Sequence, residues 1–199
     1  TLATGLSFKN ALEKGLENTT PFDASATYYV NEDNKIKTAE ESIKELGFKF
    51  NPEDKIVSYN EYKLEKTNLE SLLTKNAHGK NAEKLASTFS EYGVNAISVS
   101  SYNDIRALSG EKSVSLANNE VLISSNSSEL EGTLENVIKN NKEIEIDGKE
   151  YKIANNALIG EGKVIKEAFQ STGITNNLLT LIVPDNVLSN LNPTSNKIN

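Results

Sequence analysis

The side chains that most often carry out enzymatic chemistry are scarce in this chain of 199 residues. The chain contains no cysteine, which removes thiolate nucleophiles, disulfides and Cys-based zinc sites. His78 is the only histidine, whereas metalloprotease motifs need two. A Ser-His-Asp triad would require His78 as its base, and no Gly-x-Ser-x-Gly elbow is present to position the serine. His78 lies beside Gly79 in a polar segment, where we expect an exposed, solvated ring.

Two short segments approach ligand-binding motifs without completing them. Residues 160–163 (GEGK) resemble the end of a phosphate-binding loop, but Ala157 stands at the first glycine position and Val164 at the Ser/Thr position. A simple loop is the better interpretation. Residues 31–34 (NEDN) could hold calcium weakly, but they lack the full calcium-loop pattern and we expect an acidic turn.

Neighbouring carboxylates and glycosylation sequons add little to this inventory. The carboxylate pairs at residues 40–41 and 53–54 are adjacent in sequence, which gives no reason to place them in one cleft. Sequons at Asn18 and Asn126 matter only in a secretory pathway that uses them, and chance explains both in so asparagine-rich a chain. The residues therefore predict a non-enzymatic protein with no catalytic residue, metal site or cofactor, and they leave the ligand-binding residues unknown.

The composition limits the class of partner. The net charge is -7 and the isoelectric point about 4.9, so the acidic surface argues against nucleic acid and can attract a cationic ligand. No run approaches the roughly 20 apolar residues of a membrane span, and no signal peptide is recognisable. The chain begins at Thr1 and contains no methionine, from which we expect it to be part of a longer protein.

Hydrophobic periodicity predicts alternating helices and strands. We expect helices over residues 2–17, 35–46, 81–92, 101–108 and 130–139, a short helical turn over 68–73, and strands over 23–30, 55–64, 96–99, 120–124, 144–146, 151–153 and 178–183. Residues 164–170 suit a short helix or strand, residues 76–81 a loop, and residues 192–199 a frayed end.

Local motifs set some of the boundaries. Residues 101–104 match a capping box that makes Ser101 the cap of a short helix, which ends near Leu108 with Gly110 behind it. Asp147 and Gly148 suit a type I′ hairpin turn between two strands.

Four tyrosines lie on two predicted strands. Strand alternation sends Tyr28 and Tyr29 to opposite faces, so one of them can face solvent. Core packing is the first interpretation for this pair and for Tyr59 and Tyr62. An exposed aromatic surface for a peptide or partner protein is the alternative.

These elements predict an α+β fold of two mixed α/β lobes with antiparallel or mixed sheets, because the hairpin rules out a wholly parallel sheet. The helix at residues 2–17 suits either an ordinary surface-packed helix or a stalk that continues a membrane helix, and we expect residues 1–20 to form the stalk. Residues 21–75 and 145–199 would form a membrane-proximal lobe, and residues 76–144 a second lobe.

Several segments resemble the extracellular segment of FtsX-like ABC transporter permeases of the bacitracin-export type. The resemblance is carried, in order, by Ile97-Ser98, Tyr102-Asn103, residues 108–110 (LSG) and residues 116–120 (LANNE) within residues 97–126, and by residues 17–26 (ENTTPFDASA) and 179–185 (LTLIVPD). It spans nearly the whole chain. The outer two segments look like the family's exit from one membrane helix and its return to the next.

The resemblance implies an extracellular domain that lies between two membrane helices of a permease. Such permeases protect low-GC Gram-positive bacteria from antimicrobial peptides that target the cell wall, such as bacitracin and lantibiotics, and often signal to a histidine kinase. The implied partners are the peptide or a peptide-bound cell-wall lipid precursor, a separate ATPase subunit and the kinase. The fragment itself is expected to be monomeric and to bind no nucleic acid.

Two alternative functions remain open. A mechanotransmitting extracellular domain of another export or lipoprotein-release permease would belong to the same superfamily and would need an adaptor protein. A wall-associated hydrolase would need a carboxylate in a deep cleft with a second one at glycosidase spacing.

Overall fold

Eight strands form one sheet in the computed structural model, which describes residues 26–29, 57–76, 94–125, 127–166, 179–193 and 195–198. The strand order is β1-β8-β2-β3-β7-β4-β6-β5. The strands are β1 (Ala26–Tyr29), β2 (Ser58–Leu64), β3 (Val94–Ser98), β4 (Glu120–Ser124), β5 (Glu143–Ile146), β6 (Lys149–Ile153), β7 (Thr180–Val183) and β8 (Ser195–Ile198).

The sheet is mixed, which confirms the predicted α+β class. β3 runs parallel to β7 and β4 parallel to β6, whereas the other neighbours are antiparallel. β7 lies between β3 and β4 and hydrogen-bonds to both. β7 comes from the predicted membrane-proximal lobe, whereas β3 and β4 come from the predicted second lobe. Strands of both predicted lobes therefore share one sheet, and the division into lobes stays a prediction.

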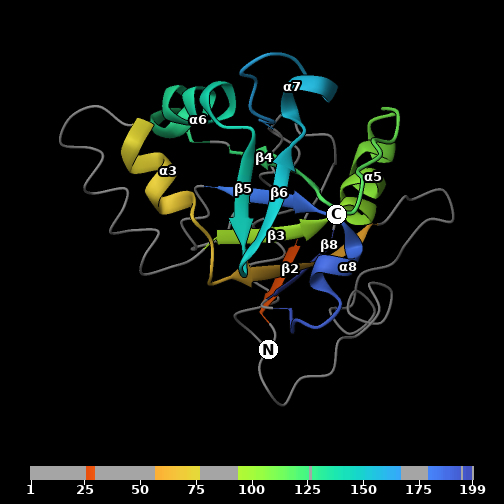
Figure 1. The fold of residues 1–199 in the computed structure, drawn as a ribbon. Coiled ribbons are helices and arrows are strands. Elements are labelled where there is room, and N and C mark those ends of the chain that lie inside the picture. The colour runs from red at the N-terminus through yellow and green to blue at the C-terminus, as the bar shows by residue number, and fades with distance from the viewer. Residues whose placement is uncertain are drawn as a thin grey trace, which may run out of the picture.

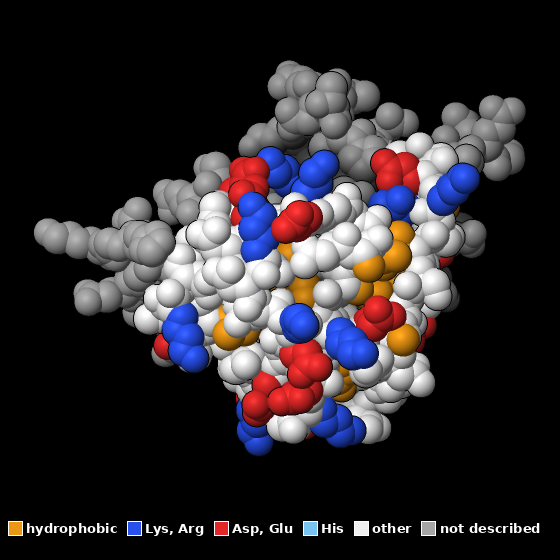
Figure 2. Space-filling view, turned by 45° about the horizontal axis from the view of Figure 1, so that its top comes forward, with side chains coloured by type: hydrophobic (Ala, Val, Ile, Leu, Met, Phe, Trp, Pro, Cys, Tyr) orange, Lys and Arg blue, Asp and Glu red, His pale blue; other side chains and the backbone are white. Residues whose placement is uncertain are grey.

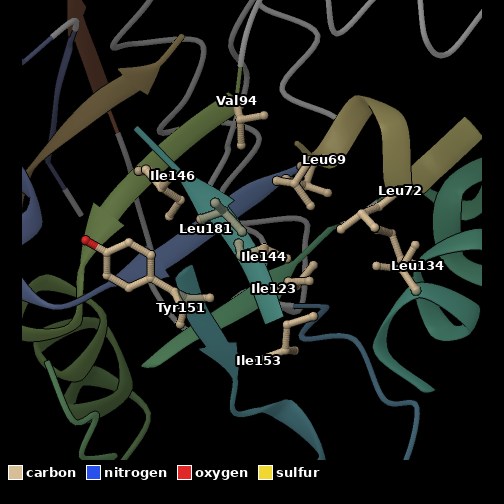
Figure 3. Packing of buried hydrophobic residues seen from close by; sticks show 14 of the residues in the cluster. Leu69, Leu72, Val94, Ile123, Leu134, Ile144, Ile146, Tyr151, Ile153 and Leu181 are labelled. Atoms are coloured by element: carbon tan, nitrogen blue, oxygen red, sulfur yellow. The ribbon is translucent and has the colours of Figure 1, made fainter. Parts of the chain in front are cut away.

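Alternating side chains bury both faces of the central strands. In β4, Val121 and Ile123 belong to one hydrophobic cluster, and Leu122 between them belongs to another. The same alternation places Leu181 of β7 in the first cluster and Ile182 in the second. Figure 3 shows the first cluster, in which sheet residues such as Leu181 pack near Leu69 and Leu134.

The helices cover the two faces of the sheet unequally. α3 (Leu69–Asn76) and α6 (Ser128–Asn140) pack against each other and close the first cluster. α5 (Val99–Leu108) packs on β2, β3 and β7 and supplies Tyr102 and Ile105 to the second cluster. Figure 1 shows α3 and α6 on one side of the sheet and α5 on the other.

The predicted hairpin is confirmed. Asp147 (φ 48°) and Gly148 (φ 77°) occupy the two left-handed positions that a type I′ turn requires, with Ile146 paired to Lys149. Ile144, Ile146, Tyr151 and Ile153 enter the first cluster. Residues 66–68 lie along the outer edge of β5 and cover part of it. The Asp147 N–H, just after β5, donates to Lys66 O at 2.8 Å.

Most of the other predicted helices and strands that fall in the described residues are present. The structure confirms the strands at 23–30, 55–64, 96–99, 120–124 and 178–183 and the helices at 68–73 and 130–139, with shifts of a few residues at their ends. Within residues 164–170, Ile165 forms an isolated parallel bridge with Ser124. Two one-turn helices were not predicted, α7 (Asn155–Leu158) and α8 (Asp185–Leu188). The predicted helices at 2–17, 35–46 and 81–92 and the loop after Asn76 lie outside the described residues.

The predicted cap at Ser101 is wrong. α5 begins at Val99, and the Oγ atom of Ser98 accepts a hydrogen bond from the Ser101 N–H at 3.1 Å. Ser98, Ser100 and Ser101 can all act as caps by residue type. The structure uses Ser98, whose hydroxyl also donates to the Ser101 Oγ atom at 2.9 Å, so the Ser101 side chain is a partner of the cap and not the cap itself. The predicted C-terminal end is confirmed, since the helix ends at Leu108 and Gly110 has φ +72°.

The prediction of a frayed end at residues 192–199 is also wrong. Ser195–Ile198 form β8, which lies between β1 and β2. The segment SNKI has no alternating apolar pattern, and its strand partners are more than 130 residues away in sequence. Long-range pairing, rather than local propensity, therefore makes it a strand.

Candidate functional site

The segment between α5 and β4 is held in a defined position although it contains no regular secondary structure. We call residues 111–117 the α5–β4 segment. It runs without a turn or bend, and Val114 and Leu116 are partly buried against the second hydrophobic cluster. Ser113, Ser115 and Ala117 are exposed between and beside them. This alternation is that of an extended strand lying on the protein surface.

Asn103 of α5 clamps the middle of this segment. Its Oδ1 atom accepts a hydrogen bond from the Val114 N–H at 2.8 Å, and its Nδ2 group donates to Val114 O at 2.9 Å. The Asn103 side-chain amide thus bonds the N–H and the C=O of Val114 as the backbone of a neighbouring strand would. Without the Asn103 amide, both backbone groups of Val114 would lose this partner.

Arg106, the only arginine in the chain, fastens the start of the segment. Its Nε group donates to Lys112 O at 2.7 Å, and its Nη1 group lies 2.9 Å from the Glu111 carboxylate. The same Nη1 group donates to the Tyr102 hydroxyl at 3.1 Å, and the guanidinium lies 5.4 Å from the Tyr102 ring centre.

Glu120 closes the other end of the segment. Its Oε1 atom accepts a hydrogen bond from the Ala117 N–H at 2.7 Å, and its own N–H donates to Ala117 O at 3.0 Å. Several residues that carry the family resemblance, including Tyr102, Asn103 and Glu120, therefore position this segment. Their types are explained by these contacts.

A group of hydroxyls and one carboxylate lies where the parallel strands β3 and β7 end. Asp185, the first residue of α8, accepts hydrogen bonds from the Ser100 N–H, at 3.2 Å, and from the Ser100 hydroxyl. The carboxyl ends of parallel strands are a common place for ligand sites. Here the carboxylate instead bonds a free N–H in the first turn of α5, so the contact links two helices.

The outward face of the β5–β6 hairpin is rich in carboxylates. Glu145 lies directly across from Glu150, and Glu143 lies across from Lys152. A hydrogen bond and charge repulsion from Glu143 raise the pKa of the Glu150 carboxyl above its usual value, because two like charges compete on one exposed surface. This face offers negative charge to a cationic partner. Figure 2 shows one face of the molecule where acidic and basic side chains intermix with small apolar areas.

The GEGK segment is a loop, as predicted, and its backbone N–H groups bond within the chain. The Gly160 N–H donates to Asn155 O, the Gly162 N–H to the Asn156 side chain and the Lys163 N–H to Gly160 O. A phosphate-binding loop needs such N–H groups to point at its ligand. In this loop they are used internally.

Asn155, which the sequence did not single out, holds this loop against the sheet. It is fully buried, and its side chain bonds the N–H and the C=O of Ile123 at 2.8 and 2.9 Å. Its Nδ2 group also donates to Lys163 O at 3.0 Å. An asparagine two residues after a strand is a weak sequence signal, so only the structure identifies this role.

The tyrosine prediction is confirmed where the structure tests it. Tyr59 is 3% exposed in the second cluster, and Tyr62 packs against the first. The side chains of Tyr28 and Tyr29 are outside the described residues, as are His78, residues 31–34, 40–41 and 53–54, and the sequons at Asn18 and Asn126.

Within the described ranges, no group of three or more His, Cys, Asp or Glu side chains could hold a metal ion. No helix among these residues has the length and apolar character needed to cross a membrane. Comparison with protein-family models, curated proteins and solved structures finds no match to this chain.

Proposed function

We propose that this chain is an extracellular, non-enzymatic sensing and binding domain of an ABC transporter permease that confers resistance to cell-wall-targeting antimicrobial peptides. The ligand would be a bacitracin- or lantibiotic-class peptide, alone or bound to a cell-wall lipid precursor. ATP hydrolysis would take place on a separate subunit, and signalling would pass to a histidine kinase through the intact permease.

The pairing of β1 with β8 carries the proposal. Ala26 at the start of β1 lies opposite Ile198 at the end of β8, so the chain enters and leaves the sheet at the same place. Paired Cα atoms in antiparallel strands are only about 4.5–5.5 Å apart. This geometry suits a domain inserted between two neighbouring membrane helices, since the first and the last strand of the sheet meet at one place.

The resemblance and the charge support the same proposal. The residues that carry the resemblance around α5 belong to one continuous unit, from β3 through α5 to β4. The net charge of -7 and the carboxylates on the outer face of the hairpin suit a cationic peptide better than an anionic ligand.

The test replaces residues 26–198 of the intact permease with a four-residue Gly/Ser linker. Because Ala26 and Ile198 are register partners, such a linker can join the flanking residues without stretching them. We expect the minimal inhibitory concentrations of bacitracin and of a lantibiotic to fall to those of a strain without the permease.

Two controls make this result specific. The exchange Ser71→Ala, at an exposed position on α3, should leave resistance unchanged. Membrane abundance of the shortened permease and its binding to the ATPase subunit should match the intact protein. Resistance and induction that persist without residues 26–198 would contradict the proposed function.

A further inference from the structure

The α5–β4 segment has one bonded side and one open side. In an extended chain, the N–H and C=O groups of successive residues point in opposite directions. Those of Val114 point at Asn103. Those of Ser113 and Ser115 must therefore point the other way, away from the Asn103 clamp.

The open side carries backbone groups that no described contact uses. Among the hydrogen bonds of the described residues, none involves the N–H or C=O of Ser113 or Ser115. Both residues are exposed. They are spaced by two residues, about 6.6 Å, which matches the repeat of outward-facing groups on a strand edge.

We propose that this open edge binds an extended peptide, which adds to the α5–β4 segment as a neighbouring strand. Up to four backbone hydrogen bonds to Ser113 and Ser115 would hold the peptide. The small side chains of Ser113, Ser115 and Ala117 allow a second backbone to approach to the roughly 4.8 Å of paired strands. Binding through the main chain makes the site tolerant of peptide sequence.

The edge is already ordered before a peptide arrives. Arg106 holds Lys112, Asn103 holds Val114 and Glu120 holds Ala117. Three side chains therefore fix three successive parts of the segment. A preordered edge loses little conformational entropy on binding, which favours strand addition.

A peptide fits this edge better than a second copy of the chain does. Within the α5–β4 segment, Ser113 and Ser115 are the two residues whose outward N–H groups no described contact uses. Two such edges paired together would bury far less than the roughly 1,200 Å² of a stable protein interface. A flexible peptide needs only the strand edge itself.

The test uses the full 199-residue chain and a linear octapeptide of alternating lysine and threonine with blocked ends. Titration is followed by amide NMR shifts and hydrogen exchange at about 150 mM salt. We expect Ser113 and Ser115 amides to shift and become protected, while the Val114 amide, already bonded to Asn103, changes little. Protection confined to other surfaces, or dimerisation of the chain through this edge, would overturn the inference.

Proline variants test the same edge by removing its donors. Ser113→Pro with Ser115→Pro should weaken peptide binding roughly tenfold, because two N–H donors are lost. Ser113→Ala with Ser115→Ala keeps both donors and should bind as the wild type does. Equal binding by the proline variant, with an unchanged Val114 amide showing that the segment is intact, would also overturn the inference.

This inference rests on the proposed function only for the identity of the natural peptide. The peptide titration and the resistance experiment can fail independently, so a failure of this inference is distinguishable from a failure of the proposed function. An edge that does not bind the octapeptide leaves the resistance experiment unaffected, whereas resistance without residues 26–198 leaves the peptide titration of the chain intact.

Discussion

The β5–β6 hairpin and the α5–β4 segment are both extended pieces of chain at the protein surface, but different forces hold them. The hairpin is held by a two-residue turn, its own ladder and an apolar inner face. The α5–β4 segment has no ladder, and three side chains from α5 and β4 take its place.

This difference determines which backbone groups remain available to bond a partner. In the hairpin, β6 and residues 66–68 use most of the β5 backbone, so side chains dominate what it presents to solvent. In the α5–β4 segment, Arg106 and Asn103 bond Lys112 and Val114 from one side, and Glu120 bonds only Ala117 at the end of the segment. The other side keeps free backbone groups, which is why we place peptide binding there.

The largest expected effect on stability comes from removing an apolar side chain on the inner face of the hairpin. Ile144 is 1% exposed in the first cluster, and Ile144→Ala should lower the free energy of unfolding by about 2–5 kcal/mol through lost burial and a cavity. Denaturant unfolding measures this change. Glu145→Ala, at an exposed position on the same strand, should stay within about 0.5 kcal/mol of the wild type. Similar losses in both variants would show that the apolar face is not what holds the hairpin.

A smaller effect is expected from the clamp. Asn103→Ala removes both hydrogen bonds to Val114, which should cost about 1–3 kcal/mol. Hydrogen exchange should accelerate across residues 111–117 but not in the hairpin. Asp104→Ala, at the exposed next position on α5, is the matched control. Unchanged exchange in Asn103→Ala would mean that packing of Val114 and Leu116, and not the clamp, orders the segment.

The smallest effect concerns charge on the outer face of the hairpin. The pKa of Glu150 is raised in the folded protein, so folding favours its protonated form. Its contribution to stability is therefore complete below the ordinary value of 4.5 and is lost as pH rises through the raised pKa. Glu150→Gln should be slightly more stable than the wild type at neutral pH, with the difference vanishing below pH 4.5.

Thermal unfolding from pH 3 to pH 8 measures this dependence. Lys149→Gln, which changes a charge on the same strand but not the repulsion from Glu143, is the control. A Glu150→Gln variant that is less stable than the wild type at neutral pH would show that this carboxylate has a favourable partner.

Local sequence signals predicted much of the fold. The Asp147-Gly148 turn correctly located both hairpin strands, because only residues that tolerate positive φ complete a type I′ turn. The strand at 120–124 and the end of α5 before Gly110 were also correct. In each case the deciding residues lie within a few positions of the boundary.

The candidate site was harder to predict. Three serines near the start of α5 were equivalent as caps by residue type, and the tertiary structure alone identified Ser98 as the cap. The amides of Asn103 and Asn155 bond residues 11 and 32 positions away, and no local pattern marks such a partner. The resemblance located the unit but implied no role for these residues.

By itself, the sequence determined the α+β class, the hairpin, the acidic charge and the absence of thiol chemistry, because these depend on residue types and short-range geometry. Tertiary structure alone decided the strand order, the meeting of β1 with β8 and the open edge at Ser113 and Ser115. Each of these depends on which distant backbone group finds a partner. That outcome is set by the packing of the whole sheet and not by any single segment.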